Sequence, residues 1–169
     1  YLHDLGIRDL REPFQQAFRQ VFPDSPPQPG PALDARVYGM THIIIAASGY
    51  YQRPVQREDF PWLFDYFQRY HHELIAYTKP DIYTEMALCF LLAGEGDSPV
   101  VRAVGEALEH VYDPQAEMIP SAHWGTDLNK GEHRNVLAIM LYHWPSRLHP
   151  GPDLSQYPAY RQRFAEAGQ

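Results

Sequence analysis

Three apolar runs, each opened by one ionisable side chain, constrain the fold more than any other feature of the sequence. They span Met40 to Ala47, Tyr83 to Phe90 and Gly131 to Tyr142. Superposing the runs places His42, Glu85 and His133 at equivalent positions, 43 and 48 residues apart (42 to 85 and 85 to 133). The β-branched residues Ile43-Ile44-Ile45 also suit a central strand, but no partner strand is evident. We therefore predict three buried helices, over Arg36 to Tyr51, Ile82 to Ala93 and Gly131 to Trp144.

The segments between these runs are amphipathic. Helical spacing of apolar residues predicts outer helices over Glu58 to Ala76 and Ser98 to Tyr112, and a further helix over Asp9 to Phe22. Buried and amphipathic helices alternate every 40 to 50 residues, which is the pattern of stacked α-hairpins. The predicted fold is all-α, a partial α/α toroid with alternating inner and outer helices.

The length of 169 residues fits one domain with a sizeable core. We divide it into an N-terminal helix (1–23), a proline-rich connector (24–35), a toroid-like helical core (36–145) and a proline-rich C-terminal tail (146–169) with a short surface helix over Tyr157 to Phe164. The single cysteine, Cys89, lies inside an apolar run, so it is expected to be buried and forms no intramolecular disulfide.

Charge and hydropathy narrow the classes of partner. The formal net charge of −7, with scattered lysines and arginines, argues against a nucleic-acid surface. No apolar run approaches the roughly 20 residues that span a bilayer, so no membrane partner is expected. The chain begins at Tyr1 without a methionine, so a leader or a longer N-terminal segment could have been removed. The compartment is therefore left undecided, with the cytoplasm slightly favoured.

A resemblance to a known family rests on three groups of residues. They are Thr41-His42-Ile43-Ile44 with Tyr50, Asp81 with Glu85, and the block from Met118-Ile119-Pro120-Ser121 through Asp127-Leu128 to Gly131-Glu132-His133-Arg134-Asn135. Over residues 36 to 145 the sequence resembles a family of uncharacterised bacterial proteins whose domain is similar to the α/α toroids of terpenoid cyclases. The resemblance implies inner helices whose heads line one end of a central cavity, and it implies no particular reaction. The aspartate-rich repeat of the cyclases and the Cys/Cys/His zinc set of lanthionine cyclases are both missing from the sequence.

If the buried helices stack in register, His42, Glu85 and His133 converge. Two imidazoles and one carboxylate are a recurring ligand set for iron(II), and they also suit zinc with an open coordination position. We therefore predict a site for a divalent metal, iron or zinc.

A metal-free site is the alternative. Glu132, His123, Asp127, Asn135 and Tyr50 are the candidate catalytic residues, and the imidazole, phenol and amide groups among them suit acid/base chemistry of the kind used by carbohydrate-active enzymes on α/α barrels. Candidate substrate-binding residues are Trp124, which is an aromatic side chain in a polar loop, Arg134 and Asp81.

These residues predict an enzyme acting on a small molecule or peptide at the N-terminal heads of the inner helices. A non-catalytic module that binds a ligand or another protein is the second reading. The chain is also expected to be able to form a homo-oligomer, because a partial toroid leaves apolar inner helices to be covered.

Overall fold

The computed structural model describes residues 3, 8–121, 123, 125–151 and 157–159. Its elements are six α-helices and two short 3₁₀-helices, and the described residues contain no β-strand. The all-α prediction is thus confirmed. The chain separates into two compact units, residues 1–25 with 150–169 and residues 26–149. No helix of the described residues is long and apolar enough to cross a membrane.

The first unit contains α1 (Arg11–Val21). Phe14, Phe18 and Phe22 lie one helical turn apart and form a row of tilted ring contacts, with centroids 6.2 and 4.8 Å apart. The helix predicted from Asp9 begins two residues later, and Leu10 occupies its N-cap position. The Asp9 carboxylate still accepts a hydrogen bond from the backbone N–H of Arg11 (3.0 Å).

The second unit contains the other helices, and proline opens four of them. They are α2 (Pro31–Ala47), α3 (Pro61–Tyr77), α4 (Pro80–Leu92) and α5 (Pro99–Val111), and the last helix is α6 (Glu132–Tyr142). Proline suits the first helical position because its fixed φ is helical and its missing N–H would lack a partner there. The 3₁₀-helices are η1 (Arg57–Asp59) and η2 (Leu128–Lys130).

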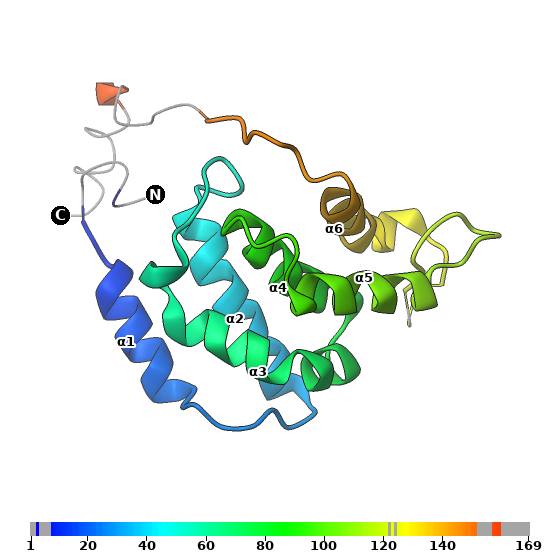
Figure 1. Ribbon diagram of the computed structural model, residues 1–169, viewed down its shortest axis with the longest axis horizontal. Helices are drawn as coiled ribbons and strands as arrows, with labels where there is room; N and C mark the ends of the chain where they lie inside the picture. Colours follow the sequence, from blue (N-terminus) through cyan, green and yellow to red (C-terminus); the bar gives the residue numbers. More distant parts are fainter. Residues whose placement is uncertain (1–2, 4–7, 122, 124, 152–156, 160–169) are drawn as a thin grey trace. The chain divides into compact units, whose positions relative to one another are not determined.

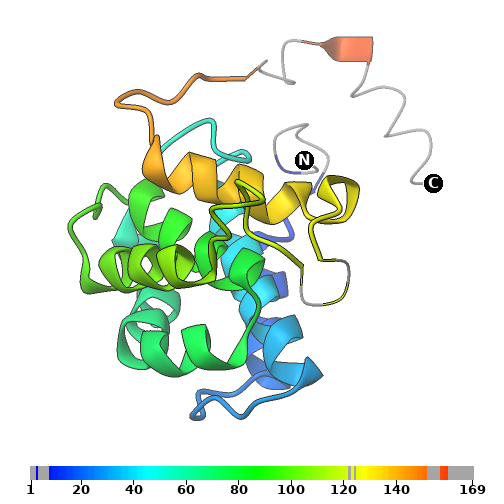
Figure 2. The ribbon, with the colours of Figure 1, turned by 90° about the vertical axis from the view of Figure 1, so that its right-hand side faces the viewer.

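Helix α4 is the centre of this unit (Figures 1 and 2). It packs against α2, α3, α5 and α6, whereas α3 packs mainly on α4 and α5. Ten of its residues are buried, among them the polar residues Thr84 and Glu85. The ring of Phe90 meets that of Phe64 on α3 edge-on, with centroids 5.1 Å apart. Because α2 and α6 both lie against α4, side chains from these three helices can meet on one face.

The prediction that the site lies at the helix heads is wrong for two of its three central residues. Helix α2 begins at Pro31 and not at Arg36, so His42 lies eleven residues into the helix, and Glu85 lies five residues after Pro80. Pro31, which we assigned to the proline-rich connector, starts the helix. Asp81 is the second residue of α4, and Lys79 is the N-cap.

Candidate functional site

Glu85 is the most buried ionisable side chain of the predicted site. Its side chain is 3% exposed, and it points from the middle of α4 toward residues of α2 and α6. Thr41 Oγ1 lies 2.7 Å and His42 Nδ1 lies 3.4 Å from Glu85 Oε2. His133 Nε2 lies 3.8 Å from the other oxygen, Oε1. The three residues that the helical register aligned therefore do come together, from three different helices.

One carbonyl and one hydroxyl determine where the protons lie on the α2 side. The Tyr38 carbonyl can only accept, so His42 Nδ1, 3.0 Å away, carries a proton and donates it. Thr41 Oγ1 is also within reach of this carbonyl (2.9 Å), but the hydroxyl has one hydrogen and can give it to Glu85 Oε2 instead. In this arrangement Oε2 is an acceptor, and a proton on Glu85 belongs on Oε1, which faces α6.

Burial favours the neutral forms of both Glu85 and His42. Desolvation raises the pKa of Glu85, helped by the charge of Asp81 and opposed by the Thr41 hydrogen bond and by His133. Desolvation also lowers the pKa of His42, against the hydrogen bond to the Tyr38 carbonyl. The 3.4 Å contact between the two side chains is therefore not an ion pair but a contact between a neutral imidazole and a carboxyl group that resists ionisation.

His133 is the exposed member of the group, with its side chain 58% exposed. Its Nδ1 faces Asp81 Oδ2 at 3.8 Å while Nε2 faces Glu85 Oε1 at 3.8 Å. Both separations exceed hydrogen-bond length, so the imidazole ring faces the two carboxyl groups without a hydrogen bond to either of them. Asp81 Oδ1 is buried and accepts no hydrogen bond.

Asn135 lies two residues after His133 in the first turns of α6. The Asn135 amide accepts from the Ile119 N–H (2.8 Å) and donates to the carbonyls of Ile119 (3.1 Å) and Gly131 (2.8 Å). These bonds tie the loop before α6 to the first turn of the helix. The Asn135 side chain, which we predicted to be catalytic, thus makes its hydrogen bonds to main-chain groups. The sequence did not indicate this structural role.

Comparison with known families gives one match. A family model described as a domain of unknown function, DUF3541, covers residues 1–166. The chain belongs to the DUF3541 family. The expectation of an uncharacterised domain family is thereby confirmed. No curated protein and no solved structure matches the chain.

The other predicted residues of this DUF3541 chain lie around the loop and α6. Glu132 and His123 are exposed, and Asp127 caps η2 by accepting from the Asn129 N–H (3.0 Å). Arg134 is partly buried, and its Nε makes no hydrogen bond. The Glu85 contacts described above are with Thr41, His42 and His133, and none of these four residues supplies one. Trp124 lies outside the described residues.

A strained turn follows α2 and brings in a residue that the sequence analysis missed. Gly49, Tyr50 and Tyr51 all have positive φ, of 67°, 57° and 66°. Such angles are uncommon for non-glycine residues and persist only where the surroundings enforce them. Here buried Ser48 holds the turn, because its Oγ donates to the Ile45 carbonyl (2.6 Å) and accepts from the Tyr51 N–H (2.8 Å).

The two tyrosines of this turn differ in their exposure. Tyr50, the predicted catalytic residue, is 47% exposed. Tyr51 is more enclosed, and its pKa is raised by burial and by the charge of Glu85. Tyr51 is therefore the tyrosine of this turn whose pKa is raised by the charge of Glu85. Its positive φ could not be read from the sequence because it depends on contacts that Ser48 makes.

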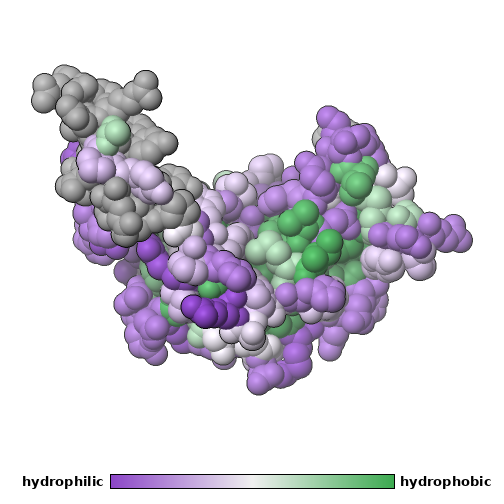
Figure 3. Space-filling model, turned by 90° about the horizontal axis from the view of Figure 1, so that it is seen from above, coloured by the Kyte–Doolittle hydropathy of each residue, from purple (hydrophilic) through white to green (hydrophobic). Residues whose placement is uncertain are grey.

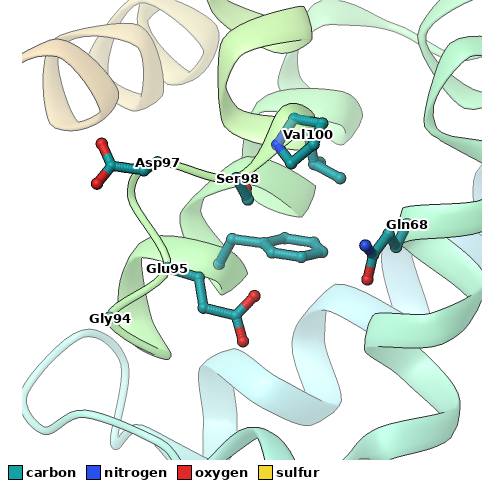
Figure 4. Close-up of a pocket in the computed structure, with 8 residues that line it drawn as sticks. Gln68, Gly94, Glu95, Asp97, Ser98 and Val100 are labelled. Atoms are coloured by element: carbon teal, nitrogen blue, oxygen red, sulfur yellow. The ribbon is translucent and has the colours of Figure 1, made fainter.

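A separate cavity of about 330 Å³ lies where α3 faces the turn between α4 and α5 (Figure 4). It contains none of the predicted site residues. Glu95 on its wall is held by Arg57 Nη1 at 2.9 and 3.2 Å, and Arg57 Nη2 also donates to Gln68 (2.9 Å). Glu95 and Gln68 beside this cavity are thus already paired.

Proposed function

We propose that this chain is an enzyme that acts on a small molecule or peptide by general acid/base chemistry on the α2–α4–α6 face. The observation that supports this most strongly is the placement of buried Glu85 beside His133. A carboxyl group whose pKa is raised by burial can hold a proton to give to a substrate. An imidazole next to it, with one nitrogen turned toward a carboxylate, can take a proton.

The roles follow from the proton positions. Glu85 Oε1–H serves as the general acid, and Thr41 and His42 orient its carboxyl group through Oε2. His133 Nε2 serves as the base, and Asp81 on its Nδ1 side favours the tautomer with the proton on Nδ1. A substrate group bound between Oε1 and Nε2 receives the Glu85 proton and gives another to His133, and a later proton transfer from Nε2 to Oε1 restores the starting protonation of both groups. Addition, elimination, isomerisation and hydrolysis all fit this scheme.

The direct test combines activity and titration. Purified protein is assayed on panels of esters, peptides, glycosides and hydroxy acids, alongside Glu85→Gln, His133→Ala and the control Glu95→Gln. We expect an activity that falls about 100-fold or more in the first two variants and stays near the wild-type value in the control. Activity unaffected by either site variant would contradict the proposal. So would a Glu85 carboxyl carbon that titrates in ¹³C NMR near the ordinary value of 4.5.

A metal-dependent reaction is the second candidate, favoured by the convergence of His42, Glu85 and His133. As placed, no group of three His, Cys, Asp or Glu side chains within the described residues could hold a metal ion. His42 donates through Nδ1 to Tyr38, so it would have to present Nε2. Elemental analysis of untagged protein, with His42→Ala and His133→Ala beside it, distinguishes the two. Stoichiometric iron or zinc, lost in both variants, would favour the metal reaction.

The alternation of helices supports a further proposal about the fold. Helices α2 and α6 flank α4, and the amphipathic helices α3 and α5 pack against each other and against α4. This arrangement fits an arc of an α/α toroid in which α2, α4 and α6 are the inner helices. An experimental structure of the chain, compared with closed toroids, would test it.

A further inference from the structure

A second cavity, of about 310 Å³, lies at the C-terminal ends of α2 and α6. Its wall is predominantly apolar and aromatic, with two histidines, and consists of Tyr51, Ile139, Met140, His143, Trp144, Pro145, Leu148 and His149. All of these belong to the same compact unit as Glu85. Tyr51 and Trp144 meet edge to face, with centroids 6.5 Å apart and planes at 77°. A cavity of this volume, lined by aromatic and aliphatic groups, matches the sites that bind small apolar ligands.

Two structural links connect this cavity to the acid/base residues. Met140 on its wall and His133 lie on α6 seven residues apart, which is close to two turns and a rise of about 10 Å. On the other side, the strained turn after α2 delivers Tyr51 into the cavity, while His42 lies further back on the same helix. Figure 3, seen from the side of the molecule on which α6 lies, shows apolar surface on this unit. Exposed Val136 lies on α6 between His133 and the exposed wall residue Ile139.

We propose that this cavity binds a ring-sized apolar group of the substrate whose polar, reacting group reaches Glu85 and His133. This inference rests on the proposed function. It narrows the substrate to an elongated amphipathic molecule, with an aromatic or alicyclic group about 10 Å from the group that gains and loses protons. The apolar stripe of α6 is then the surface along which the connecting chain lies.

The first experiment needs no knowledge of the substrate. The chain has four methionines, Met40, Met86, Met118 and Met140, of which only Met140 lines the cavity. In protein labelled with ¹³C-methyl methionine, benzyl alcohol should shift the Met140 methyl signal saturably and leave the other three in place. Signals that move together without saturation, or a Met140 signal that stays still, would overturn the inference.

Variants locate the binding and separate it from catalysis. Leu148→Ala removes part of the cavity wall and should weaken benzyl alcohol binding about tenfold, the effect of roughly 1.4 kcal/mol of lost contact. Leu128→Ala, at an exposed leucine outside the cavity, is the matched control and should bind as the wild type does. Glu85→Gln should also bind benzyl alcohol normally. An affinity that Leu148→Ala leaves unchanged contradicts the assignment of the cavity.

A series of ω-phenylalkyl amides of increasing chain length tests the link to the acid/base residues. Affinity should rise with length until the amide reaches His133, at a span of about 10 Å, and His133→Ala should remove only that gain. Affinity independent of length, with benzyl alcohol still bound, would overturn the inferred substrate class. Binding that depends on chain length, without any turnover that depends on Glu85, would support the binding site. It would count against the proposed function.

Discussion

Two glutamates on or near α4 place the same side chain in two different surroundings. Glu95, at the turn after α4, is 31% exposed and is held by the permanently charged Arg57 at hydrogen-bond distance. Glu85, inside α4, is 3% exposed, and the basic groups beside it are two histidines at 3.4 and 3.8 Å. Glu95 lines a cavity and Glu85 lines neither of the two cavities, yet it is Glu85 whose pKa is raised by burial and whose basic partners are not permanently charged.

The comparison shows that the burial of a carboxyl group and the type of its basic partner affect its ionisation more than a nearby cavity does. Arginine stays protonated at all ordinary pH values, so the Arg57–Glu95 pair fixes a charge and a geometry. Histidine changes charge near neutrality, so a carboxyl group surrounded by histidines can exchange protons. This contrast leads to four predictions.

The largest expected effect is that substitutions at the two glutamate sites change the stability of the fold in opposite directions. Arg57→Ala should destabilise the fold by about 1–2 kcal/mol, because it removes bonds to Glu95, Asp65 and Gln68 together. Glu85→Gln should stabilise it by about 0.5–2 kcal/mol, because a neutral amide replaces a carboxyl group that burial disfavours when charged. Urea unfolding midpoints at neutral pH measure both. A clear loss of stability in Glu85→Gln would remove the distinction between the two glutamates.

The next effect concerns Thr41. Thr41→Val keeps the shape of the side chain but removes the donor to Glu85 Oε2, which should cost about 1 kcal/mol. Because this hydrogen bond lowers the pKa of Glu85, its loss should raise that pKa further. Carboxyl ¹³C titration gives the pKa, and Thr78→Val, at a hydroxyl that bonds only within α3 and its cap, is the control. An unchanged or lower Glu85 pKa would show that Thr41 does not orient the carboxyl group.

A smaller effect is the dependence of stability on pH. The pKa of Glu85 is raised in the folded state, so the folded state binds more protons, and stability contributed by this group falls as pH rises above about 4.5. The pKa of His42 is lowered, so its contribution falls as pH drops below about 6.5.

The two slopes oppose each other where these windows overlap, and variants separate them. The difference in melting temperature between Glu85→Gln and wild type should grow with rising pH, whereas the difference between His42→Gln and wild type should grow with falling pH. Thermal melts from pH 4 to 8 measure both differences. Parallel curves for wild type and both variants would mean that neither group is shifted by burial.

The smallest expected effect is that of salt. The Arg57–Glu95 pair is partly exposed, so raising ionic strength from 0.05 to about 1 M should reduce the cost of Arg57→Ala by a few tenths of a kcal/mol. The effect of Glu85→Gln should change less, because buried groups are screened less. Urea unfolding at the two salt concentrations compares them, and an equal salt response would place both glutamates in similar surroundings.

The sequence by itself determined the helices and the approach of His42, Glu85 and His133. Helical periodicity is a local property, since residues three and four apart share a face whatever surrounds them. Three apolar runs of similar design therefore sufficed to predict helices that pack together and bring their polar residues close. Helix starts were less predictable, as Pro31 shows, because proline both ends and opens helices.

Only the tertiary structure decided what these residues can do. The 3% exposure of Glu85 and the use of Asn135 by the main chain both depend on contacts between segments far apart in the chain. Desolvation is the physical reason, because a pKa responds to everything that surrounds the group and not to its neighbours in sequence. The cavity beside Met140 likewise exists only where the ends of α2 and α6 meet the chain that follows α6.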